Sequence, residues 1–159
     1  MSCQQHSCTG CGGSCCAGCH QKNGLTLRRS EADFLLRFAV LPFLPVVRFS
    51  LRRFGTPAQT GDSLAPAFLQ SPADSLETVQ HTAQIIQRLE QMNLISIKYT
   101  EPLGHFNYAE YVNSCAFTEF CSAASGFTVP EIEYGSMALT AAGQEAIDDL
   151  ELVSLPSGF

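Results

Sequence analysis

The sequence predicts an α+β domain preceded by an irregular, Cys-rich N-terminal segment, and three patterns support this prediction. Residues 76–89 place apolar side chains three or four positions apart, which is typical of one face of an amphipathic helix. Residues 94–99 alternate apolar and polar side chains, as a half-buried strand does. Residues 1–24 show neither period and consist mostly of cysteine, glycine, serine and glutamine, so a tail is expected there and not a core.

The domain is expected to open with a helix. The Ser30 hydroxyl can accept a hydrogen bond from the backbone N–H of Asp33, which predicts a helix start at Ser30. The apolar stripe of this helix consists of Phe34, Leu35, Phe38 and Ala39. Pro42 ends the helix, and Pro42 and Pro45 together predict a rigid, extended connection to residues 46–49.

The middle of the chain contains the clearest helix. A polar loop is predicted at residues 56–63 and a short strand at 67–69. The helix should then start near Ser71, bury the apolar positions of residues 76–89, and end at Asn93, a residue that suits a helix C-terminus.

The last third is predicted to return to the same sheet. After the strand at 94–99, residues 103–133 are expected to be irregular and rich in aromatic side chains. A strand should follow at 134–139. Thr140 is then expected to cap a final helix over residues 141–150.

The tail contains six of the eight cysteines in the chain, namely Cys3, Cys8, Cys11, Cys15, Cys16 and Cys19. They include two C-x2-C pairs, Cys8/Cys11 and Cys16/Cys19. Such pairs suit one tetrahedral ion, because two intervening residues let the chain turn and aim both sulfurs at the metal. We therefore predict that the tail cysteines ligate a metal, with zinc as the first candidate.

Two alternatives remain for the tail. Cys3, Cys8 and Cys11 have the C-x4-C-x2-C spacing of plant-type ferredoxin ligands, which favours an iron–sulfur cluster with a fourth cysteine from elsewhere. A flexible tail that oxidises or binds metal adventitiously is the other. Cys115 and Cys121 are interpreted first as small buried hydrophobic side chains, and alternatively as partners of the spare tail cysteines in a second site.

Composition limits the compartment and the partners. No secretory leader opens the chain, and its longest apolar run, residues 34–51, is interrupted by two prolines and two arginines, so a cytoplasmic protein without a membrane span is expected. Reducing conditions there favour metal binding over disulfides. Residues 1–53 carry seven basic and two acidic side chains, whereas residues 54–159 carry two basic and thirteen acidic ones. The larger part is therefore poorly equipped to bind phosphates.

Residues 76–151 contain a recognisable order of motifs. The helix ends in Arg-Leu-Glu-Gln-Met-Asn-Leu-Ile at 88–95, and after two strands the sequence Leu-Thr-Ala-Ala-Gly-Gln-Glu-Ala-Ile occupies 139–147. This order resembles the winged helix-turn-helix domain of MarR- and PadR-like bacterial regulators, in which the recognition helix runs into two wing strands and a Leu-Thr-x-x-Gly step begins the next helix. The cysteine tail with the Pro-Phe-Leu-Pro motif at 42–45 is also similar to a group of uncharacterised bacterial proteins, which implies no activity.

The resemblance implies a recognition helix, whose outer face carries Gln80, His81, Gln84 and Arg88. Glutamine can hydrogen-bond adenine in the major groove. However, residues 70–77 leave room for little more than one turn before this helix, and the excursion between the wing strands is far longer than a hairpin connection. The leading expectation is a metal-binding winged-helix protein whose folded domain contacts a protein partner or a second copy. A metal- or redox-responsive DNA-binding transcriptional regulator is the alternative.

An enzyme is not expected. The sequence lacks a glycine-rich phosphate loop, a Ser–His–Asp signature and a zincin helix. A small redox protein or metallochaperone remains a third class. The predicted organisation is a metal-binding tail at 1–24, a winged-helix-like domain at 25–152 and a flexible end at 153–159.

Overall fold

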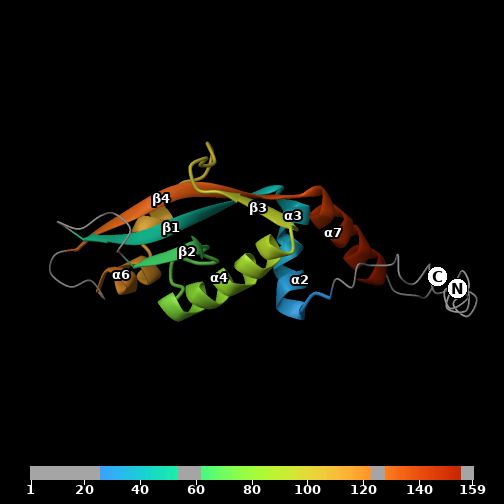
Figure 1. Cartoon of the computed structure of the whole chain (residues 1–159), viewed down its shortest axis with the longest axis horizontal. Helices are drawn as coiled ribbons and strands as arrows, with labels where there is room; N and C mark the ends of the chain where they lie inside the picture. The colour runs from blue at the N-terminus through green and yellow to red at the C-terminus, as the bar shows by residue number, and fades with distance from the viewer. Residues whose placement is uncertain (1–25, 54–61, 123–127, 155–159) are drawn as a thin grey trace, which may run out of the picture.

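The computed structural model describes residues 26–53, 62–122 and 128–154, so the predicted tail lies outside the described residues. The α+β class is confirmed, and the elements alternate along the chain (Figure 1). In order they are α2 (Arg29–Leu35), α3 (Arg37–Val40), β1 (Phe43–Arg53), β2 (Ser63–Ala67), α4 (Leu76–Gln91), β3 (Ile95–Lys98), α5 (Ala109–Val112), α6 (Cys115–Ser122), β4 (Thr128–Leu139) and α7 (Ala141–Ser154).

The four strands form one antiparallel sheet in the order β2-β1-β4-β3. β1 and β4 make a long ribbon that pairs without interruption from Phe43 opposite Ala138 to Arg53 opposite Thr128. The outer strands are shorter and cover only parts of this ribbon. Figure 1 shows α4 running below the strands, α2 crossing near the C-terminal end of α4, and α7 at one end of the sheet.

The ribbon supports a buried cluster on each of its faces. Consecutive strand residues point to opposite faces, so Val46 and Val47, both fully buried, belong to different faces. Val46 packs with Met137 in a cluster that includes α2, the C-terminal half of α4 and α7. Val47 packs with Phe49 and Phe120 in a cluster that includes α6. The apolar run at 44–47 therefore serves two cores, one toward each end of the ribbon.

The predicted central helix is confirmed as α4, with a later start. Ser75, and not Ser71, is its N-cap, and the Ser75 hydroxyl accepts a hydrogen bond from the backbone N–H of Thr78. Ser71 belongs to a preceding turn, where its backbone N–H donates to the Asp74 carboxylate. Asn93 has φ of 60°, the left-handed conformation that ends many helices, so the predicted helix end is confirmed.

The first helix starts differently from the prediction. α2 begins at Arg29, so Ser30 lies inside the helix. The side chain that caps the start of α2 is that of Glu31, whose Oε2 accepts a hydrogen bond from the backbone N–H of Arg28 at 3.0 Å. Glu31 is buried, which its exposed-looking sequence context did not indicate.

Three strand predictions need correction, and one loop prediction was wrong. The strand predicted at 134–139 is the end of β4, which begins at Thr128, and the strand predicted at 67–69 is β2, which ends at Ala67 and begins at Ser63. β1 covers eleven residues and includes Pro45, which lies beyond the part of β1 that pairs with β2, where the sheet tolerates a missing backbone donor. Residues 103–133 are not irregular throughout, because they contain α5, α6 and the first part of β4. That part of β4 lacks an apolar pattern since Glu131 and Glu133 face arginines of β1.

The second core contains a buried tyrosine, Tyr111, which is 1% exposed. Its hydroxyl accepts a hydrogen bond from the backbone N–H of Leu69 at 3.4 Å. Burial raises the pKa of Tyr111 above the ordinary value of 10.0, because the ionised form would lose its hydration.

The free energy of unfolding is therefore expected to fall at alkaline pH. The folded-state pKa of Tyr111 lies above the unfolded value of about 10, so its contribution is complete below that pH and is lost as the pH rises further. Urea unfolding from about pH 8 to 11 should show a smaller alkaline loss for Tyr111→Phe than for the wild type. Equal losses would contradict this role of Tyr111.

Candidate functional site

The six predicted metal ligands, Cys3 to Cys19, lie outside the described residues. Within residues 26–53, 62–122 and 128–154, no group of three or more His, Cys, Asp or Glu side chains is arranged to hold a metal ion. The prediction of a metal site therefore stays with the tail.

The two remaining cysteines, Cys115 and Cys121, lie on α6. Cys115 is exposed, so its interpretation as a buried hydrophobic side chain is wrong, while Cys121 is half-buried and burial raises the pKa of its thiol. The two lie six positions apart on the helix, which places them about 9 Å apart along the axis and roughly 120° apart around it. The two thiols therefore do not face each other across one metal-sized site.

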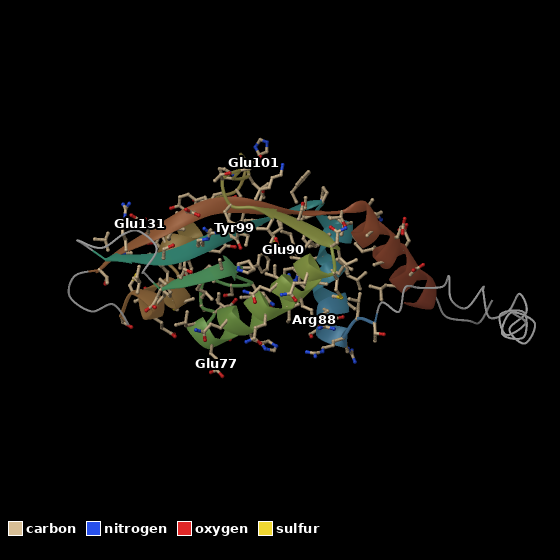
Figure 2. All side chains as sticks on the ribbon, viewed as in Figure 1. Glu77, Arg88, Glu90, Tyr99, Glu101 and Glu131 are labelled. Atoms are coloured by element: carbon tan, nitrogen blue, oxygen red, sulfur yellow. The ribbon has the colours of Figure 1, made fainter. Side chains whose placement is uncertain are left out.

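The predicted DNA-contacting residues all lie on α4. Gln80, His81 and Gln84 are exposed. Arg88 instead turns toward α2, where its Nε lies 2.6 Å from Oε1 of Glu31, a side chain that is only 2% exposed (Figure 2). All four candidates are therefore exposed, and Arg88, whose side chain is 45% exposed, also has a structural role.

The electrostatics of this region do not favour a phosphate backbone. Glu77 and Glu90 lie near the two ends of α4 (Figure 2). The basic residues Arg48 and Arg52 of β1 pair across the ribbon with Glu133 and Glu131, each at 3.3 Å. Their positive charge is therefore largely matched by carboxylates within the domain itself.

A cluster of charged and aromatic side chains joins four segments of the chain. The Arg48 guanidinium lies 4.2 Å from the centre of the Tyr99 ring and pairs with Glu133. The pKa of Tyr99 is raised, chiefly by burial and next by the negative charge of Glu90. Sequence reasoning missed this cluster because its members come from β1, β4, α4 and the end of β3. Its arginine is paired with Glu133 and stacked over Tyr99, so it is already engaged within the domain.

The most unusual surface feature is a run of five consecutive exposed apolar residues, which we call the apolar patch (residues 39–43). Its large side chains are Val40, Leu41 and Phe43, which are 81%, 55% and 56% exposed. Such runs are avoided on protein surfaces unless they serve a function. The absence of charged residues at 38–47 was the available signal, but it also fits a buried connection.

No helix within the described ranges is long and apolar enough to cross a membrane. Comparisons with protein families, with curated proteins and with solved structures found no match to this chain.

Proposed function

We propose that this protein binds zinc through its N-terminal cysteines and uses its folded domain to contact another protein chain. The observation that carries the proposal is the spacing of the tail cysteines. Cys8, Cys11, Cys16 and Cys19 supply four thiolates in two C-x2-C pairs, the usual ligand set of a structural zinc site. An iron–sulfur cluster is the alternative cofactor, because six cysteines exceed the four that one zinc needs.

The folded domain supports an interaction role through its apolar patch, since exposed apolar surface of this kind marks contact sites. A cytoplasmic location belongs to the same proposal, because reducing conditions keep the tail thiols available to a metal.

We also propose a winged-helix relationship. Its support is the order in which α4 leads into β3, β3 pairs with β4, and the Leu-Thr-x-x-Gly step begins α7. The short turn at 69–75 in place of a preceding helix is a departure from that fold.

Metal analysis of the full chain, purified without oxygen, is the test. The expected result is one zinc per chain and no visible absorption. A variant with serine at Cys8, Cys11, Cys16 and Cys19 should lose the zinc. The matched control, serine at Cys115 and Cys121, should keep it.

Two other results are informative. If the protein contains iron and absorbs visible light, the tail cysteines bind an iron–sulfur cluster and not zinc. A wild-type protein without bound metal would contradict the proposal. The tail variant should keep a wild-type thermal transition, because the described residues form two buried apolar clusters of their own. This comparison separates metal binding from folding.

A metal- or redox-responsive transcriptional regulator is the second candidate, favoured by exposed polar side chains of α4 that include Gln80, His81 and Gln84. Duplex DNA binding that weakens steeply with salt, and that is reduced in Gln84→Ala, would support it. Absence of binding at low salt would exclude it. Arg88 is unsuitable for this test because it pairs with Glu31.

A further inference from the structure

We draw no further inference here: the strongest candidate, the apolar patch (residues 39–43) where α3 ends and β1 begins, carries none because nothing in the structure shows what covers it.

Discussion

Replacing Gly143 by alanine is expected to lower the free energy of unfolding by about 3 kcal/mol or more, toward the upper range of overpacking substitutions. A Cβ at this position would meet the backbone carbonyl of Leu94, with the Leu139 side chain also too close. Backbone atoms cannot rotate away as a side chain can, so α7 would have to move from the end of α4. Urea unfolding measured by circular dichroism checks the change.

Gly104→Ala is the matched control, because an added Cβ there has no atom within 4 Å. Its free energy of unfolding should change by less than about 1 kcal/mol, as for most exposed loop substitutions. Similar losses in the two variants would show that α7 is not held tightly against Leu94.

The close approach at Gly143 gives a physical account of the Leu-Thr-x-x-Gly step. The Thr140 hydroxyl donates to the backbone carbonyl of Asn93 at 2.6 Å and accepts from the backbone N–H of Gly143 at 3.0 Å. The backbone N–H of Thr140 donates to the carbonyl of Leu94. One threonine therefore caps α7 and fastens it to the left-handed residue that ends α4, and the glycine permits the contact.

Arg88→Ala is expected to lower the free energy of unfolding by about 3–5 kcal/mol, because it leaves a buried carboxylate without its partner. The Glu31 side chain is 2% exposed and receives a charge-assisted hydrogen bond from Arg88. Arg52→Ala, which breaks the exposed pair with Glu131, is the control and should cost less than about 1 kcal/mol. Chemical unfolding of the three proteins at neutral pH makes the comparison.

A double variant tests the cause of this loss. If an unpaired buried charge is responsible, Glu31→Gln combined with Arg88→Met should be more stable than Arg88→Ala alone. The amide oxygen introduced by Glu31→Gln could still accept from the backbone N–H of Arg28, as the Glu31 carboxylate does in the wild type. A double variant less stable than the single one would assign the loss to packing of the arginine stem instead.

The sequence by itself determined the features that depend on neighbouring residues. The period of residues 76–89, the Asn93 end and the Thr140 cap located α4 and α7, and alternation located β3, because each signal is contained within a few turns or one strand. The cysteine spacing likewise stands on its own as a prediction of metal binding. These local signals sufficed for the α+β class.

Only the tertiary structure decided which side chains are buried and which of them form ion pairs. Glu31 lies in an ordinary exposed helix pattern, yet it is buried and pairs with Arg88 of α4. Ala39 was predicted in the apolar stripe of the first helix, but it lies in a run of exposed residues from 39 to 43. Burial depends on contacts between segments far apart in the chain, and no local period encodes which segment will cover which face.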